Sequence, residues 1–315
     1  MCLIRDVYLE MGGSLMSLIS ILGGYERDSQ YLKRLIRPFK PWREDFLAIS
    51  PFGWDLKVPS LCSRGEAGLI GRAFSEIFRL VLARRSGFGA SLLRRLEGAR
   101  GLETLAVVSP SLRQTIHGDF LAARTHYRKY LAQEATLGEC LDSVCLMAKL
   151  SLISSSGFCD MDARELVRGF SSRTRFELAL MADLWERFLE QRYLSGVPAP
   201  LFSPCFGPLS EGMGGASADI LHDGYLIDTV CVQNLQNLSR YMDRVATLLV
   251  LGQAFKTLDG TGYQEKGVGL YLARYGVLLL LDRGSFIRLK RAEFARAEIG
   301  VLRRFGRMDK AGVVA

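Results

Sequence analysis

The sequence lacks the residues from which disulfide frameworks and zinc centres are usually built. Its 315 residues include only three histidines, and its seven cysteines form no CxxC pair. An odd number of scattered cysteines favours reduced, mostly buried thiols in a cytosolic protein. No apolar run approaches the length of about 20 residues that a membrane-spanning helix needs, so we expect a cytoplasmic protein without a membrane partner.

Several catalytic motifs are missing as well. The chain has no GxxxxGK(S/T) loop, which argues against the common phosphate cradle of nucleotide hydrolases. With only three histidines, no serine-histidine-aspartate arrangement can be argued, and we do not expect a histidine-based metal centre. What the chain does have is positive charge: 41 lysines and arginines against 33 acidic residues give +8 at pH 7, a balance that suits a polyanionic partner.

The pattern of residues along the chain predicts four regions. Residues 1–62, rich in proline and aromatic residues towards their end, are expected to lie over the core as an irregular segment. Helical periodicity dominates residues 63–195, strand-like runs fill residues 196–284, and a basic helix occupies residues 285–315. This order predicts an α/β protein with a mixed sheet in its C-terminal part and a large helical N-terminal half.

The spacing of apolar residues and of helix breakers gives the individual elements. Within the C-terminal region the expected order is β-β-β-α-β-β. Asp160 or Asp162 is expected to cap the last helix of the helical region. The helices of that region are predicted at about residues 65–85, 116–134, 136–154 and 162–193.

Two aspartates lie on consecutive strand-like runs of the stretch GGASADILHDGYLIDTVCV, residues 214–232. Asp219 belongs to the first run and Asp228 to the second, with an Asp-Gly hairpin turn between them. Carboxylates on neighbouring strands can hold a Mg²⁺ ion that polarises a phosphate and acidifies a water. Alternate residues of a strand share a face, so Val230 occupies the face of Asp228, where a nuclease would need a lysine.

This stretch resembles a family of uncharacterised bacterial and archaeal proteins in the PD-(D/E)XK nuclease superfamily. The family pattern is a glycine-rich turn, A-D-A-D, a D-G turn and then L-I-D-I-K-T-T. Three further segments are similar to the family in the expected order, so that the resemblance covers about half of the chain. They are GLIGRAFSEIFRLVLARR at 68–85, FSPCFGP at 202–208 and GVGLYLARYGVLLLL at 267–281.

The resemblance implies a nuclease-like core in the order α-β-β-β-α-β. It also implies that Asp219, Asp228 and Glu76, the last from the early helix, are the catalytic residues of an active member. The same three carboxylates would be the ligands of a Mg²⁺ or Mn²⁺ cofactor. Glu76 has a second reading, as an ordinary solvated residue of its helix.

This chain departs from the family pattern at polar positions of the site. The family's lysine is replaced by Val230, the first aspartate of A-D-A-D by Ser217, and the aspartate of the early helix by Ser75. The Q-x-x-x-Y pair of the helix after the third strand corresponds to Asp243 and Thr247. Changes confined to the site, with scaffold glycines and apolar residues intact, predict a degenerate fold without cleavage activity.

We therefore expect a protein that binds nucleic acid, DNA in preference to RNA, or a structural subunit of a nucleoprotein complex. The superfamily commonly works in restriction, antiviral defence, recombination and repair, which implies partners of that kind. Two alternatives stay open. One is an active Mg²⁺- or Mn²⁺-dependent endo- or exonuclease whose cation has moved to Arg240, Arg244, Lys256 or Arg274. The other is a protein-interaction module that touches no nucleic acid.

Basic residues gather in three places and are the expected nucleic-acid contacts. The first is RTHYRKY, where aromatic residues alternate with cations; the second is the helix after the third strand; the third is the C-terminal basic helix. In each place the alternative is a helix face that the charges merely solvate. The residues are Arg124, Arg128, Lys129, Arg240, Arg244, Arg288, Lys290, Arg291, Arg303 and Arg304.

Overall fold

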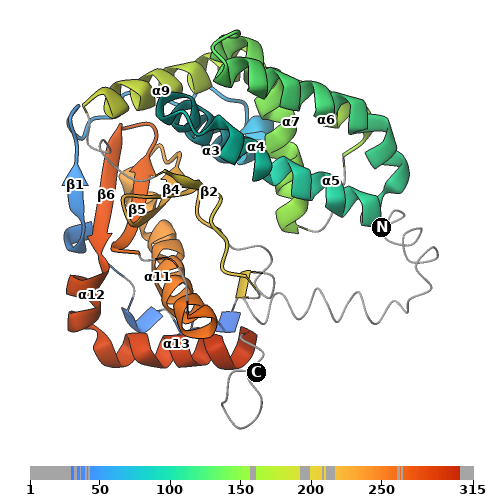
Figure 1. The fold of residues 1–315 in the computed structure, drawn as a ribbon. Coiled ribbons are helices and arrows are strands. Elements are labelled where there is room, and N and C mark those ends of the chain that lie inside the picture. Colours follow the sequence, from blue (N-terminus) through green and yellow to red (C-terminus); the bar gives the residue numbers. More distant parts are fainter. Residues whose placement is uncertain are drawn as a thin grey trace.

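A mixed sheet with helices on both faces forms the centre of the molecule (Figure 1). The first and last parts of the chain, 1–29 and 306–315, lie outside the described residues. The structure, a computed structural model, describes residues 30–31, 34–35, 37–39, 41, 43–156, 161–191, 199–207, 209–210, 217–260, 263 and 265–305.

The strands of the sheet lie in the order β1-β6-β5-β4-β3-β2. Strands β4 and β5 are parallel, and the other neighbours are antiparallel. Helix α11 (Ser239–Asp259) connects the two parallel strands, since a parallel connection has to cross back over the sheet. The predicted order β-β-β-α-β-β is confirmed. The strands are β1 (Leu47–Ile49), β2 (Leu201–Phe202), β3 (Ile220–His222), β4 (Tyr225–Val230), β5 (Gly267–Leu272) and β6 (Val277–Asp282).

Residues of β4 alternate between the two faces of the sheet. Leu226 and Val230 pack into the apolar cluster on the α11 side, whereas Ile227 belongs to the cluster on the α3 side. Asp228 therefore faces the α11 side and Thr229 the α3 side. This alternation decides which helix each polar side chain of the strand can reach.

Helix α3 (Arg64–Ser86) of the helical part covers the face of the sheet opposite to α11. Its residues Ala73, Ile77 and Leu80 are fully buried, as their spacing predicts, and the helix packs against β4, α7 and α9. It ends at Gly87, which adopts the left-handed conformation that commonly terminates helices. The remaining helices are α4 (Gly89–Arg94), α5 (Glu97–Val108), α6 (Pro110–Leu131), α7 (Leu137–Ser156), α8 (Ala163–Val167) and α9 (Ser172–Glu190).

Two parts of the helical region differ from prediction. The run predicted as one helix at 162–193 is two helices, because Asp162 caps α8 in a capping box and Ser171 caps the separate helix α9. Helix α5 was not predicted, since glycines lower helix propensity. Its Gly98 and Gly101 instead allow close packing on α7: a Cβ on Gly101 would overlap the backbone carbonyl of Leu150.

The boundaries of the predicted regions also change. Residues 47–49 of the expected irregular segment form β1, which pairs with β6 at the edge of the sheet. The basic C-terminal region contains two helices instead of one, α12 (Arg283–Leu289) and α13 (Arg291–Phe305), with a break at Lys290. Among the helices of the described segments, none combines the length and apolar character that spanning a bilayer requires.

Candidate functional site

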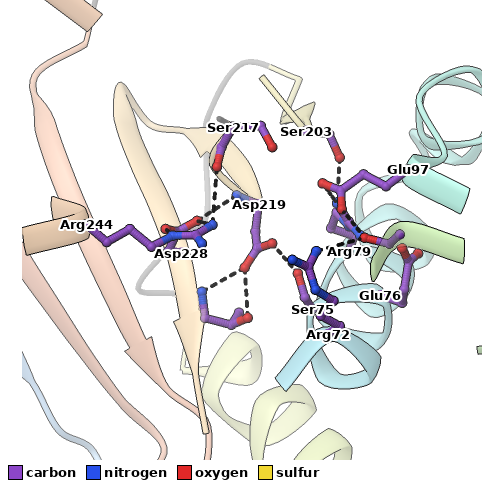
Figure 2. A network of polar contacts seen from close by, with 12 residues as sticks. Arg72, Ser75, Glu76, Arg79, Glu97, Ser203, Ser217, Asp219, Asp228 and Arg244 are labelled. Atoms are coloured by element: carbon purple, nitrogen blue, oxygen red, sulfur yellow. Dashed lines mark hydrogen bonds and ion pairs between the residues drawn. The ribbon is translucent and has the colours of Figure 1, made fainter. Parts of the chain in front are cut away.

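The structure brings Asp219 and Asp228 into direct contact (Figure 2). Asp219 immediately precedes β3 and Asp228 lies within β4, and the antiparallel pairing of these strands places them side by side. The backbone N–H of Asp219 donates to Asp228 Oδ1 at 3.1 Å. Both residues are buried, with 7% and 1% of their surface exposed.

Arg244 of α11 neutralises Asp228. Its Nε and one terminal nitrogen donate to the two carboxylate oxygens, the second at 3.2 Å, and the guanidinium also reaches the Ser217 carbonyl at 3.3 Å. This contact follows from the fold, because α11 covers the face of the sheet to which Asp228 points. Burial raises the pKa of Asp228 to about 6, although the charge of Arg244 acts in the opposite direction.

Donors from other elements surround Asp219. Ser75 Oγ of α3 donates to Oδ1, and Thr229 donates to Oδ2 from its backbone N–H at 2.7 Å and from its hydroxyl at 2.8 Å. Ser75 is the position at which the family pattern carries an aspartate. Each of the four carboxylate oxygens of the aspartate pair therefore accepts a hydrogen bond from the protein.

These contacts bear on metal binding. Asp228 pairs with the Arg244 guanidinium and Asp219 with Ser75 of α3, so an ion shared by both carboxylates would compete with the positive charge of Arg244 for Asp228. Glu76, the third predicted ligand, pairs with Arg79 at 2.6 Å instead. Within the segments that the structure describes, no three His, Cys, Asp or Glu side chains gather in an arrangement suited to a metal ion.

A buried ionic network extends from the aspartates into the helical part (Figure 2). Arg79 lies at its centre and donates to Glu76, to Glu97 and to Ser203 Oγ, each at 2.6 Å. Arg79 and Glu76 are almost fully buried, which would be costly without such partners. The network links α3, α5 and the residue that follows β2.

Glu97 connects this network to α7. It accepts a hydrogen bond from Ser151 Oγ at 2.9 Å, and Ser151 in turn accepts one from Arg72 at 3.1 Å. Burial raises the pKa of Glu76 to about 7, outweighing the opposing charge of Arg79. Burial also opposes ionisation of Glu97, but Arg79 and the Ser151 hydroxyl hold its pKa down to about 2.

Sequence reasoning missed most of this network, although α3 carries a readable signal. Arg72, Ser75, Glu76 and Arg79 follow the i, i+3, i+4, i+7 spacing of one helix face within an otherwise apolar helix. A polar stripe on a helix that must be buried predicts internal partners. Nothing local in the sequence indicates that Glu97 is one of them.

Of the residues considered as relocated cations, Arg244 reaches the aspartates. Arg274 is buried and pairs with Glu177, while its Nε donates to the Cys231 carbonyl at 3.1 Å. Lys256 lies at the other end of α11, about 18 Å along the helix from Arg244. Arg240 belongs to the first turn of α11, but its side chain lies outside the described residues.

The RTHYRKY cluster lies on α6. Arg128 and Lys129 are exposed and Arg124 is half-buried, whereas Tyr127 and Tyr130 are fully buried. Arg84 of α3 lies over the Tyr130 ring, 4.7 Å from its centroid. Both tyrosine rings are thus occupied within the helical core and do not offer a surface for base stacking, which favours the alternative of a solvated helix face.

The C-terminal basic residues lie on a different surface. Helix α13 buries Phe294, Ala297 and Val301, and its arginines point away from that side. Helices α6 and α13 are at opposite ends of the molecule (Figure 1), so the predicted contacts form separate surfaces. On α12 and α13 the exposed basic residues are Arg288, Arg291, Arg296, Arg303 and Arg304, and Lys290 is half-buried.

Comparisons of the chain with protein-family models, with curated proteins and with solved structures return no match. Membership of the PD-(D/E)XK superfamily therefore stays a prediction from the sequence motifs. The fold and the site define a class in physical terms: an α/β protein with an open mixed sheet and a buried aspartate pair whose oxygens are all engaged by protein donors.

Proposed function

We propose that this chain is a nucleic-acid-binding protein built on a nuclease-like scaffold whose acidic site no longer cleaves. The observation that carries the proposal is a contrast between two sets of arginines. Arg244 and Arg79 are held by carboxylates in and around the acidic site. The exposed arginines of α12 and α13 face outward from the apolar side of their helices.

The outward-facing arginines form a positively charged surface of the kind that binds polyanions. Among the described residues, neither Arg291 nor Arg296 forms an ion pair with a carboxylate. Arg288 has a carboxylate near it, because hydrogen bonds from Ser285 and the charge of Arg288 together lower the pKa of Asp282. The acidic Glu298 of α13 turns toward α11, where it accepts a hydrogen bond from Thr257 Oγ1 at 2.8 Å. Guanidinium groups that are not neutralised by the protein are available to bind phosphates and release counterions.

The arrangement of the aspartates supports the proposed loss of cleavage. A hydrolytic site would need a metal ion held by open carboxylate oxygens and a free cation that stabilises the attacking hydroxide. Here Arg244 covers Asp228, and Val230, at the position of the family's lysine, is buried among apolar side chains. The arrangement supports a structural role for the pair, in which it joins β3 and β4 to helices on both faces.

The test is binding and cleavage measured in the same reactions. Labelled single- and double-stranded DNA and RNA are incubated with Mg²⁺ or Mn²⁺ and analysed by gel shift and by product length. We expect salt-dependent binding without cleavage, unchanged by Asp219→Ala. The triple substitution Arg288→Gln, Arg291→Gln and Arg296→Gln should weaken binding at least about tenfold. The absence of any shift at low salt would contradict the proposal.

A matched control distinguishes this surface from general charge. Arg128→Gln combined with Lys129→Gln and Arg113→Gln removes the same charge from exposed positions of α6. If binding depends on α12 and α13, this control should change the affinity far less than the triple substitution. An equal loss in both variants would show that binding reflects net charge alone.

A second function, metal-dependent cleavage, is favoured by one observation. Arg244 places a cation within hydrogen-bonding distance of Asp228, which is the location that a relocated catalytic cation would need. In that case metal-dependent cleavage would be detectable and would disappear in both Asp219→Ala and Arg244→Ala. Cleavage that survives either substitution would point to a contaminating nuclease.

A further inference from the structure

Three exposed arginines of α4 and α5, the α4–α5 arginines, lie outside the basic surfaces described above. Arg94 is the last residue of α4, Arg95 follows it as the C-cap, and Arg100 belongs to the first turn of α5. Within the part of the chain that the structure describes, none of the three forms an ion pair with a carboxylate. Their positive charge is therefore open to a partner outside the protein.

The carboxylate that is nearest in the sequence does not pair with these arginines. Glu97 is directed into the core, where it accepts a hydrogen bond from Arg79 at 2.6 Å, and its side chain is 18% exposed. Glu103, about one turn beyond Arg100, is exposed and forms no ion pair with it among the described residues. The stretch RRLEGAR (94–100) therefore buries its acidic side chain and keeps its three cations on the surface.

Two of the α4–α5 arginines lie near one point of the surface. Tyr263, which follows α11, donates from Oη to the Cys205 carbonyl at 2.6 Å. Burial raises the pKa of Tyr263, and the nearby charges of Arg95 and Arg100 act in the opposite direction. Guanidinium groups that face the same hydroxyl repel each other, and an anionic ligand between them would relieve this repulsion.

The start of α5 lies beside the aspartate pair (Figure 2). Arg79, which holds Glu97, also donates to Ser203 Oγ at 2.6 Å, and the Ser203 N–H donates to the Asp219 carbonyl at 2.9 Å. Helix α4 packs against β2, the strand that precedes Ser203. These contacts fix the first turn of α5 next to the end of the sheet where Asp219 lies. A ligand held by the α4–α5 arginines would therefore lie close to the acidic site.

The exposure of the α4–α5 arginines favours a polymeric ligand. A small anion is typically bound in a concave site that encloses most of its surface, whereas these three side chains come from two helices and remain on the surface. Successive phosphates of a nucleic-acid backbone can each meet a different guanidinium group. Such groups match phosphate oxygens in bidentate geometry, and their binding releases counterions.

We propose that Arg94, Arg95 and Arg100 form a second phosphate-contact surface, which holds the backbone of a bound nucleic acid beside the aspartate pair. The proposal deepens the nucleic-acid-binding function and rests on it. The surface is separate from that of α12 and α13, because α4 and α5 pack among α3, α6 and α7, whereas α13 packs on α11 and α12 on β5 and β6 (Figure 1). A strand that contacts both surfaces has to extend across the molecule.

The first experiment measures affinity and its dependence on salt. Binding of the full-length protein to labelled single-stranded DNA, single-stranded RNA and a DNA duplex is followed by fluorescence anisotropy at several NaCl concentrations. Arg94→Gln combined with Arg95→Gln and Arg100→Gln should weaken binding at least about tenfold. It should also reduce the slope of log affinity against log salt by about 2, because each lost phosphate contact removes about 0.7–0.9 from that slope.

The control removes the same charge from α6. Arg113→Gln combined with Arg128→Gln and Lys129→Gln lowers the net charge equally at exposed positions. We expect this variant to change the affinity and the slope far less than the α4–α5 variant. Thermal melting verifies that each variant is folded.

Photo-crosslinking tests where the strand lies. p-Benzoylphenylalanine is incorporated in place of Glu103, on the exposed side of α5, or in place of Phe176, which is 59% exposed on α9. At equal occupancy of the protein by the strand, we expect a crosslink from position 103 and none from position 176. A crosslink from neither position, in a protein that binds the strand, would overturn the placement on α5.

The outcomes separate this proposal from the function on which it rests. Binding that is weakened by the triple substitution on α12 and α13 but not by the one on α4 and α5 overturns the second surface and leaves the nucleic-acid-binding function standing. Equal losses in the α4–α5 and α6 variants also overturn it, since they reflect net charge alone. If the wild-type protein binds no strand at low salt, both proposals fail.

Discussion

Arg244 donates hydrogen bonds to both carboxylate oxygens of Asp228, and the two residues come from a helix and a strand that the fold packs face to face. The pair is asymmetric, because 55% of the Arg244 side chain is exposed while Asp228 is almost completely buried. Arg244 can therefore remain hydrated on one side while it neutralises a carboxylate that water does not reach.

Replacing Arg244 should destabilise the protein in a pH-dependent manner. The folded pKa of Asp228, about 6, lies above its ordinary value of 3.8, so the contribution of Asp228 to stability is greatest below about pH 4 and is lost as the pH rises through 6. Without Arg244 the ionised form becomes less favourable still. We expect Arg244→Ala to lose about 1–2 kcal/mol at pH 8, a value reduced for solvent exposure, and much less at pH 5.

Urea unfolding at both pH values measures this difference. Arg296→Ala, which removes an exposed arginine of α13, is the control and should change the free energy of unfolding by less than about 0.5 kcal/mol. Equal losses for Arg244→Ala at pH 5 and pH 8 would contradict a role in neutralising Asp228.

The contribution of Glu97 to stability should depend on pH in the opposite direction to that of Asp228. Its folded pKa, about 2, lies below the ordinary value of 4.5, so its contribution is present above pH 4.5 and is lost as the pH falls toward 2. We expect Glu97→Gln to cost about 3 kcal/mol at pH 7, because the ionised carboxylate is held by Arg79 and Ser151. The cost should shrink steadily in unfolding experiments between pH 5 and pH 3. Glu103→Gln, at an exposed position of the same helix, should have little effect at any pH.

Restoring a lysine at position 230 should not create a nuclease. Val230 is 2% exposed and packs in the apolar cluster beneath α11, so the ammonium group of Val230→Lys would be buried there. We expect a loss of about 3 kcal/mol or more in the free energy of unfolding, and no metal-dependent cleavage. Val230→Met, the control, lengthens the side chain similarly without adding charge, so it separates the effect of side-chain volume from the effect of the buried charge. Robust cleavage by the lysine variant would instead show that a single missing cation inactivates the site.

Replacing a glycine by alanine should lower the stability of the protein in α5 and raise it in α6. A Cβ on Gly101 would overlap the Leu150 carbonyl, so Gly101→Ala should force α5 away from α7 and cost about 3 kcal/mol or more. Gly118 of α6 is exposed with open space around its Cα, so Gly118→Ala should stabilise the protein by about 0.5–1 kcal/mol. Thermal melting compares the two, and a stable Gly101→Ala variant would contradict the close helix packing.

The sequence predicted the order of strands and helix along the C-terminal region, and the aspartate pair, because both depend on local patterns. Apolar alternation marks β4, and the short turn between β3 and β4 brings Asp228 of β4 beside Asp219, the residue that precedes β3. It did not predict β1, a strand of three residues whose pairing with β6 joins positions more than 200 residues apart. Short strands carry little periodic signal, and their partners cannot be identified from neighbouring residues.

By itself, then, the sequence determined which residues are polar within buried elements: the two aspartates of the sheet and the stripe of Arg72, Ser75, Glu76 and Arg79 on α3. Only the tertiary structure decided how these charges are paired. Arg244, Lys256 and Arg274 were equivalent candidates in the sequence. In the structure, the packing of α11 pairs Arg244 with Asp228, and the turn after β5 pairs Arg274 with Glu177. Lys256, at the far end of α11, pairs with neither carboxylate. The physical reason is range: hydrogen bonds and ion pairs act over a few ångströms, and distances of that size between remote segments are set by the packing of the whole core.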